Sequence, residues 1–128
     1  LTGTILTQSN LTGANLNGVD LSNKDLTGAI LTGVDFSNTD LTGAILTQSN
    51  LTRANLNGVD LSNKDLTGTI LTQSNLTGAN LNGTILRNTD LTGANLTGVD
   101  LSNTDLTGAI LKDAKKIEIS INNPSNSN

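Results

Sequence analysis

The chain has 128 residues, of which 34% are apolar, with one Phe and no Trp, Tyr, Met, Cys or His. The lack of Cys and His excludes a disulfide framework, Cys metal sites and the commonest general base. The net charge is −4, and only four Lys or Arg precede residue 111, which argues against direct binding to nucleic acid. No apolar run approaches the ~20 residues needed to span a membrane.

Residues 1–115 follow a period of five. Leu stands at position 1 and at every fifth position to 111, with Phe36 as the one substitute, and the register ends at Lys116. On an α-helix, steps of five scatter Leu around the axis, and on a straight strand they alternate between its two faces. Leu can face one interior each time only if the chain turns once per pentad. The period therefore predicts an all-β solenoid with a leucine core.

The other pentad positions fit a regular corner. The residue two before each Leu is usually small or β-branched, as at Ala14, Val19 and Ala29, and it shares the inward face with Leu. The residue two after Leu is usually Gly or Asn, the types that tolerate positive φ. The residue before Leu is often Asp or Asn, whose side chain can hydrogen-bond the turn. Each pentad is thus predicted to form one side and one corner.

Six Ile residues that directly precede a Leu indicate how many pentads close one coil. Their spacings along the chain alternate between five pentads and three pentads. Four pentads per coil place them on two adjacent sides, whereas three pentads per coil scatter them over all sides. We therefore expect about six coils with four pentapeptides per coil, so that positions four pentads apart stack on one side. The six residues are Ile5, Ile30, Ile45, Ile70, Ile85 and Ile110.

Residues 116–128 leave the period. Ile117, Ile119 and Ile121 alternate with polar residues, which predicts a half-buried strand that caps the last coil. We expect Pro124 to end the pairing and a disordered polar tail to follow it. No similar cap precedes Leu1, so we expect either more chain there or an end-to-end homodimer through the uncapped N-terminal coil. No localisation is predicted.

Three tandem segments carry a family resemblance: Ala14-Asn15-Leu16, Ala79-Asn80-Leu81 and Ala94-Asn95-Leu96. This pattern resembles the pentapeptide-repeat family, and the resemblance implies a right-handed quadrilateral β-helix over residues 1–115. Lys24 and Lys64 depart from the family pattern, because they occupy its small inward position. We expect each lysine stem to follow the coil wall and its amine to reach solvent.

The six Ile residues are the first candidate site. If they point outward on two adjacent sides, they form a checkerboard of apolar side chains beside one edge of the solenoid. Contiguous exposed apolar surface often marks an interface. The alternative is that each Ile is an isolated relic of repeat duplication. The sequence therefore predicts a non-enzymatic scaffold that binds a protein partner it does not identify, with Ile45 and Ile70 at the centre.

The second candidate site is an acidic strip of Asp20, Asp40, Asp60 and Asp100. These carboxylates could bind a cation or mimic DNA, or they could simply cap turns in solvent. Among proteins that resemble this chain, the quinolone-resistance pentapeptide proteins are similar to DNA in shape and charge and act on DNA gyrase. DNA mimicry toward gyrase is therefore an alternative function.

Outward Thr ladders supply a third alternative, an ice-binding surface. One ladder would contain Thr12, Thr32, Thr52, Thr72 and Thr92. Thr is also simply a favourable strand residue. We find no nucleophile–base pair, phosphate loop or metal-ligand cluster, so no enzyme activity, cofactor, metal site or membrane association is predicted.

Overall fold

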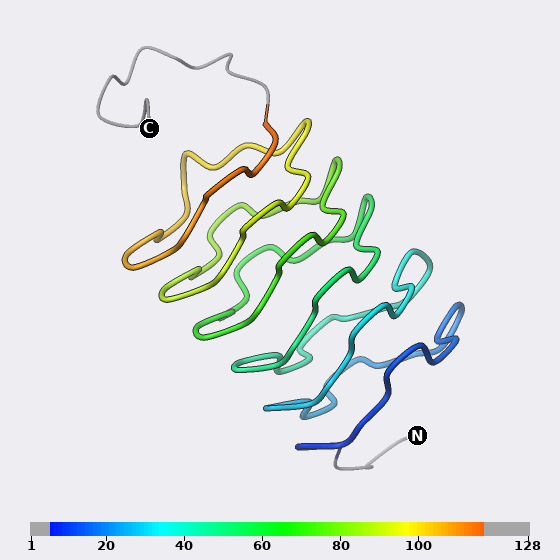
Figure 1. The fold of residues 1–128 in the computed structure, drawn as a ribbon. Helices are drawn as coiled ribbons and strands as arrows, with labels where there is room; N and C mark the ends of the chain where they lie inside the picture. The colour runs from blue at the N-terminus through cyan, green and yellow to red at the C-terminus, as the bar shows by residue number, and fades with distance from the viewer. Residues whose placement is uncertain (1–5, 117–128) are drawn as a thin grey trace.

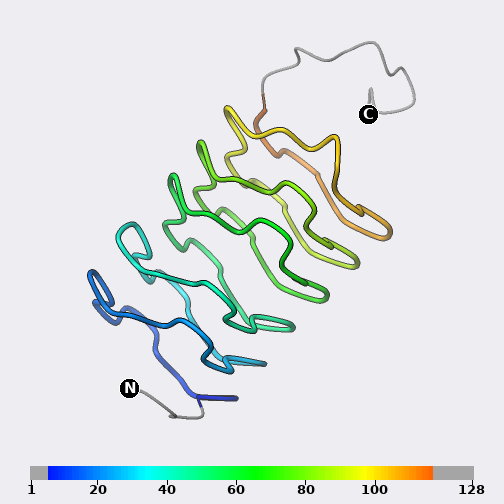
Figure 2. The same cartoon turned by 180° about the vertical axis from the view of Figure 1, so that it is seen from behind.

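The computed structural model describes residues 6–116, which form a rod of stacked laps (Figures 1 and 2). At most positions, the residue before Leu forms an isolated parallel bridge with the residue four pentads later, such as Asn10 with Ile30 and Asn15 with Asp35. One lap therefore takes four pentads, as the Ile spacing predicts. The described residues contain these single bridges and no helix, and hence no helix that could span a membrane.

Each pentad closes with a tight turn. The backbone N–H three residues after Leu donates to the Leu carbonyl, as from Ala29 to Leu26 at 2.9 Å. The residue two after Leu has positive φ at every described corner except Asn38 and Asn103. Positive φ at this position is the mark of a type II turn, which favours Gly. The predicted corner chemistry is confirmed, with two Asn corners as exceptions.

Neighbouring laps are joined by backbone hydrogen bonds on both sides of most bridges. Leu31 N–H donates to Asn50 O at 2.7 Å, and Asn50 N–H donates to Ala29 O at 2.9 Å. Because this pairing recurs along the rod, each inner lap satisfies its backbone polar groups through its two neighbours.

The interior is a stack of leucines. Every Leu from Leu16 to Leu96 is buried, and Phe36 is fully buried in the same stack. Small residues two positions before Leu, such as Ala29 and Val34, line the interior and are also fully buried. Leucines of the first and last described laps pack against this core but are only partly buried. The prediction that Leu faces inward is confirmed for the described laps.

Corner residues stack from lap to lap. At Gly43, a Cβ atom would lie 2.1 Å from Asn23 Oδ1 in the preceding lap, whereas at Gly58 a Cβ would meet nothing within 4 Å. The same order, an amide side chain followed one lap later by Gly, recurs at several corners. These pairs are Gln8–Gly28, Asn23–Gly43, Gln48–Gly68, Asn63–Gly83, Gln73–Gly93 and Asn88–Gly108.

Buried hydroxyl groups at the small inward position usually bond to a turn carbonyl. Thr89 Oγ1 donates to Leu86 O at 2.8 Å, and Ser49 Oγ donates to Leu46 O at 2.8 Å. Within residues 6–116, the buried hydroxyls of Thr69 and Ser74 have no such partner. The two side chains belong to consecutive pentads of one lap.

Residues 117–128 lie outside the described residues, and so do the predicted capping strand and tail.

Candidate functional site

The residues that precede Leu point outward and stack into four columns, which we name after one member of each. The Ile30 column contains Asn10, Ile30, Asn50, Ile70, Asp90 and Ile110. The Ile45 column contains Asp25, Ile45, Asp65, Ile85 and Asp105. The Asn55 column contains Asn15, Asp35, Asn55, Asn75, Asn95 and Lys115. The Asp40 column contains Asp20, Asp40, Asp60, Asn80 and Asp100.

The predicted Ile residues occupy two neighbouring columns, as the sequence analysis expects. Ile30, Ile70 and Ile110 share one column and are 38%, 40% and 51% exposed, whereas Ile45 on the next column is 46% exposed. Ile85 is half-buried, and Ile5 lies outside the described residues. Within each described column, isoleucines alternate with polar residues, and an Asp or Asn always lies between two of them. The apolar side chains therefore form a checkerboard, not a continuous stripe.

These isoleucines make no side-chain hydrogen bond that stabilises the turn after them. Where Asn50 precedes Leu51, its Oδ1 accepts hydrogen bonds from the Thr52 backbone N–H at 3.0 Å and from Thr52 Oγ1 at 2.6 Å. An Ile side chain can accept neither bond, and at these positions it also leaves apolar surface in water. The local fold thus favours Asp or Asn over Ile at each of these positions.

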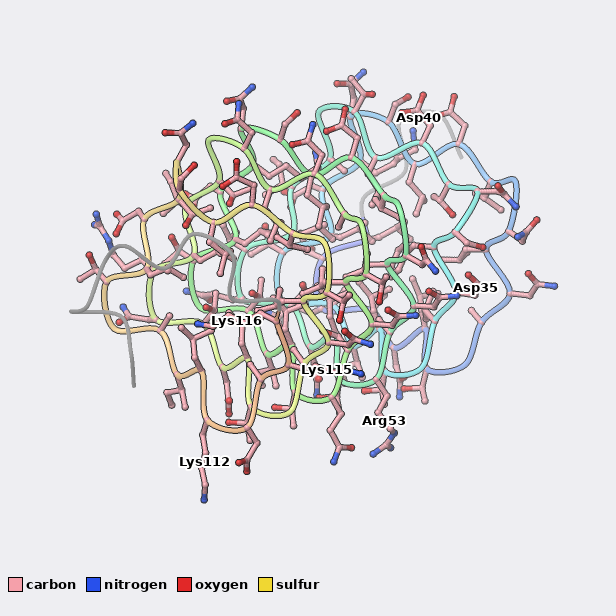
Figure 3. All side chains as sticks on the ribbon, turned by 90° about the horizontal axis from the view of Figure 1, so that it is seen from above. Asp35, Asp40, Arg53, Lys112, Lys115 and Lys116 are labelled. Carbon is pink, nitrogen blue, oxygen red and sulfur yellow. The ribbon has the colours of Figure 1, made fainter. Side chains whose placement is uncertain are left out.

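The Asp40 column places the predicted acidic residues on one side of the rod. Figure 3 shows Asp40 on the opposite side from Arg53 and Lys112. Bridges join Asp20 to Asp40 and Asp60 to Asn80, but in the described laps none joins Asp40 to Asp60. Every Asp of this column accepts a 2.9 Å hydrogen bond from the backbone N–H two residues on.

These hydrogen bonds govern the ionisation of the acidic strip. The Ser22 hydroxyl and backbone N–H lower the pKa of Asp20, and the Thr42 backbone and hydroxyl lower the pKa of Asp40. The same kinds of bond lower the pKa of Asp60 and Asp100. The charge of Asp20 raises the pKa of Asp40 only as a smaller opposing effect. The carboxylates are thus ionised and held by their own turns.

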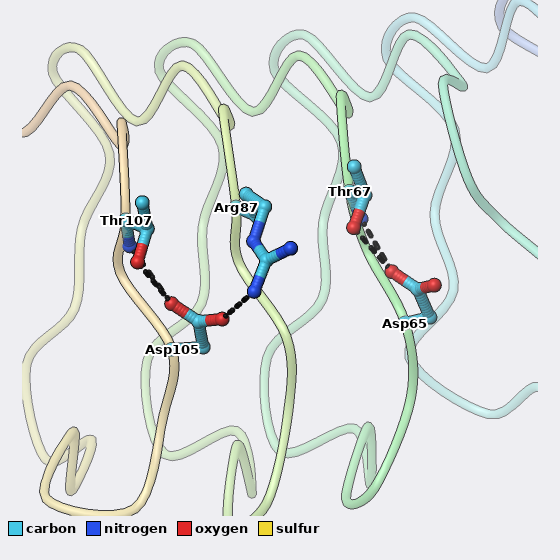
Figure 4. Close-up of polar contacts among 5 residues, drawn as sticks. All are labelled: Asp65, Thr67, Arg87, Asp105 and Thr107. Atoms are coloured by element: carbon cyan, nitrogen blue, oxygen red, sulfur yellow. Dashed lines mark hydrogen bonds and ion pairs between the residues drawn. The ribbon is translucent and has the colours of Figure 1, made fainter.

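Carboxylates also flank the isoleucines of the Ile45 column. Figure 4 shows Asp65 bound by Thr67, and Asp105 bound by Thr107 and Arg87. The Arg87 guanidinium donates to Asp105 Oδ2 at 2.7 Å. Hydrogen bonds from Thr107 and Arg87 lower the pKa of Asp105 to about 2. This ion pair was not predicted, although a lap of four pentads places Arg87 and Asp105 in adjacent laps.

The side-chain amine of Lys64 does not lie where the sequence predicts. Its amine was expected to reach solvent, but Nζ donates to the carbonyl oxygens of Leu41, and of Ala44 at 3.3 Å, in the preceding lap. Burial lowers the pKa of Lys64, and Asp60 and Asp40 oppose this effect. The prediction was wrong because two carbonyls of the preceding lap lie within reach of the stem. Lys24 is buried at the equivalent position two laps earlier.

The described residues contain no group of three or more His, Cys, Asp or Glu side chains that could hold a metal ion. Many outward Thr side chains that follow an Asx residue turn their hydroxyls back onto it, as Thr92 does to Asp90 at 2.6 Å. The surface therefore consists largely of turn-bonded polar side chains interrupted by isoleucines.

A family model for pentapeptide repeats matches the chain in overlapping segments that together cover residues 1–113. These segments are 1–33, 9–48, 35–73, 49–88 and 74–113. No curated protein sequence matches the chain significantly.

Two solved structures of pentapeptide repeat proteins from cyanobacteria are similar to the chain in sequence. The pentapeptide repeat protein Rfr23 from the cyanobacterium Cyanothece 51142 is 31% identical, over 90% of this chain and 86% of that protein, with a TM-score of 0.42. HetL, from the cyanobacterium Nostoc sp. strain PCC 7120 and involved in heterocyst differentiation regulation, is 28% identical over 87% of this chain and 78% of its own, with a TM-score of 0.37.

A third solved structure is similar in fold alone. Full-length QnrB1, a plasmid-mediated fluoroquinolone resistance protein, is 18% identical over 88% of this chain and 65% of its own, with a TM-score of 0.57.

Proposed function

Because this chain belongs to the pentapeptide-repeat family, we propose that it is a non-enzymatic scaffold that presents flat, repeated faces to a protein partner. We also propose that its laps form the family's right-handed, four-sided β-helix with about six coils. The lack of any His or Cys supports a non-enzymatic role, since neither the commonest general base nor a thiol nucleophile is available.

The exposed isoleucines carry the proposal. Four of them are 38–51% exposed on two adjacent columns, at positions where the turn would be better served by Asp or Asn. Neither burial nor turn capping accounts for them, and contact with another molecule is a role that suits exposed apolar side chains better than an isolated relic of repeat duplication does. Ile45 and Ile70 lie in the middle of the rod and would be the central contacts.

The test is a comparison of single variants. Ile45→Ser and Ile70→Ser are expected to weaken binding to a partner that the unmodified chain captures and that then binds it in purified form. Asn80→Ser is the matched control, because Asn80 also precedes a Leu and is exposed, but lies on the Asp40 column. Unchanged affinity of both Ile variants for every captured partner would contradict the proposed site.

The acidic strip supports a second candidate function, a DNA-like surface that acts on DNA gyrase. Asp20, Asp40, Asp60 and Asp100 stay ionised because their pKa values are lowered, and Asp40 lies on a side of the rod away from Arg53 and Lys112. A supercoiling assay with micromolar protein tests it. Inhibition of gyrase that is lost in the double variant Asp40→Asn, Asp60→Asn would support this function, and no effect on gyrase would exclude it.

A further inference from the structure

The Ile30 column is the one column of the described residues that combines two features. Its bridges are unbroken, since each member from Asn10 to Ile110 pairs with the next. It also carries three of the four isoleucines that are exposed within residues 6–116, yet only one charged residue, Asp90. The Asn55 column is equally regular but polar throughout, and the Ile45 column alternates its isoleucines with Asp25, Asp65 and Asp105.

A partner that contacts every lap of this column must itself repeat at the lap spacing. Laps joined by backbone hydrogen bonds lie ~4.8 Å apart. An extended peptide, with a side chain on one face every ~6.7 Å, soon loses register with the laps. A helix rises ~1.5 Å per residue and also drifts out of phase. A second copy of this chain has the required spacing, because its laps repeat at the same distance.

The alternation of Ile with polar residues makes the column complementary to itself. We propose that two copies of the chain pack antiparallel, face to face through the Ile30 column. In the register that sets all three isoleucines against isoleucines, Ile70 lies opposite Ile70 of the second copy, and Ile30 lies opposite Ile110. Asn50 then lies opposite Asp90, where its amide can donate to the carboxylate. This inference rests on the same role for exposed isoleucines as the proposed function.

Charge selects the antiparallel arrangement. A parallel pair would bring Asp90 to the same height as Asp90 of the second copy within the contact, and Lys112 to the same height as Lys112 at its end. Repulsion between these like charges disfavours a parallel dimer. In the antiparallel pair the nearest like charges are Arg53 and Lys112 of the second copy, at the rim. Both point outward from the rod (Figure 3), so water screens their repulsion.

The contact is small. Five laps at ~4.8 Å extend over only about 25 Å, so the buried area falls below the ~800 Å² per partner of a standard interface. We therefore expect a weak dimer that forms at about 10–100 µM protein or above.

The lack of Cys in the chain permits a direct test. Single variants Ile70→Cys and Ile45→Cys would be treated at ~100 µM with a bismaleimide that spans about 10 Å, the spacing of two packed sheets. Ile45 is the matched control, because its exposure of 46% is close to the 40% of Ile70. We expect Ile70→Cys to give cross-linked dimer at least tenfold faster. Equal rates, or faster cross-linking of Ile45→Cys, would overturn the proposal.

Sedimentation of chains without Cys supplies the second measurement. We expect concentration-dependent dimer for the unmodified chain and for Ile45→Asp, and monomer for Ile70→Asp with an unchanged circular dichroism spectrum. A monomer at millimolar concentration, or a dimer that survives Ile70→Asp, would overturn the proposal, the latter in favour of end-to-end pairing. If Ile70 supports dimerisation while Ile45→Ser and Ile70→Ser leave every other partner bound, only the scaffold function fails. If the unmodified chain is a monomer but Ile45→Ser loses a bound partner, only the dimer proposal fails and the scaffold function stands.

Discussion

At the scale of single residues, the corners show how one side chain limits its neighbour in the next lap. Gly43 and Gly58 both have a φ of +70°, so any L side chain meets the same backbone strain at both positions. They differ in what lies beside them. A Cβ at position 43 would collide with the Asn23 amide, whereas the space beside Gly58 is open.

We predict that Gly43→Ala destabilises the chain more than Gly58→Ala. Gly58→Ala should cost about 1–2 kcal/mol in free energy of unfolding, from the left-handed backbone alone. Gly43→Ala should cost roughly 1–3 kcal/mol more, because the methyl group displaces the Asn23 amide. Urea denaturation measures both. The extra cost should disappear in the background of Asn23→Gly, and its persistence there would show that the amide is not its cause.

Buried hydroxyls offer a second comparison within one column of the interior. Thr69 and Thr89 are both fully buried, but only Thr89 Oγ1 has a hydrogen-bond acceptor among the described residues. We predict that Thr89→Val lowers the free energy of unfolding by about 1 kcal/mol, whereas Thr69→Val leaves it unchanged or raises it by about 1 kcal/mol. Thermal unfolding of the two variants side by side measures the difference. Equal losses would show that the Thr69 hydroxyl is bonded in solution.

At the scale of the pentad and the lap, Lys64 lies beside a break in the ladder of the Ile45 column, whose other described neighbours are bridged. Elsewhere the residue before Leu commonly donates its N–H to a carbonyl of the preceding lap, as Ile45 does to Lys24 O and Ile85 to Lys64 O. In the described laps no such bond links Asp65 to Ala44, and Ile45 and Asp65 form no bridge. The Lys64 amine binds the Ala44 carbonyl instead.

We predict that Lys64→Ala restores the ladder and stabilises the chain by about 1 kcal/mol, because it removes a partly buried charge and frees the carbonyl for Asp65 N–H. Hydrogen exchange at the Asp65 amide should slow in the variant, and the denaturation midpoint should rise. A lower midpoint with unchanged exchange at Asp65 would show that the lysine stabilises the ladder.

Much of this architecture could be predicted from the sequence, because it follows from a period that every pentad repeats. Leu must turn inward, Gly and Asn must form corners, and the Ile spacing favours four pentads per lap over three. The sequence could not predict the position of the Lys64 amine, because that depends on which carbonyls lie within reach of a flexible stem. Likewise, the period gives Asn38 and Asn103 the same corner position as Asn23, whose φ is positive, and so predicts positive φ at all three.

The candidate site was predictable to a similar degree. The placement of Ile30, Ile45 and Ile70 on adjacent columns follows from the lap length alone. The lower exposure of Ile85 and the ion pair between Arg87 and Asp105 depend on side-chain conformation between laps, which no repeat pattern specifies.

At the scale of the whole molecule, much of the surface repeats every two laps. Amide and Gly corners alternate, and so do Ile and polar residues in the two Ile columns. The alternation at the corners has a steric cause, since an amide side chain in one lap fills the space that a Cβ would need in the next. A two-lap repeat therefore lets the chain carry large corner side chains without clashes.

The pH dependence of stability is a property of the whole set of carboxylates. Most of the aspartates have a pKa below the usual 3.8 in the folded chain, down to about 2 for Asp105, mainly through hydrogen bonds. A lowered folded pKa contributes stability that is present above the unfolded pKa and is lost as pH falls toward the folded pKa.

We therefore predict that the free energy of unfolding is constant from about pH 5 to 8, where no side chain of the chain normally titrates, and falls between about pH 4 and 2. Because hydrogen bonds and not ion pairs dominate, 1 M NaCl should leave the acid midpoint nearly unchanged. Denaturation followed by circular dichroism across this pH range measures both. A large upward or downward shift with salt would show that charge–charge interactions control acid unfolding.

The columns, the faces and both proposals depend on one lap of four pentads, and engineered disulfides test that length most directly. The pair Asn55→Cys, Asn75→Cys joins bridged positions four pentads apart, and the pair Asn55→Cys, Ile70→Cys joins positions three pentads apart. Bridged residues in adjacent laps lie ~4.8 Å apart, within the ~4.4–6.8 Å range of disulfides. We predict that mild oxidation closes an intramolecular disulfide in the first pair and not in the second. Closure of the second pair alone would contradict the account.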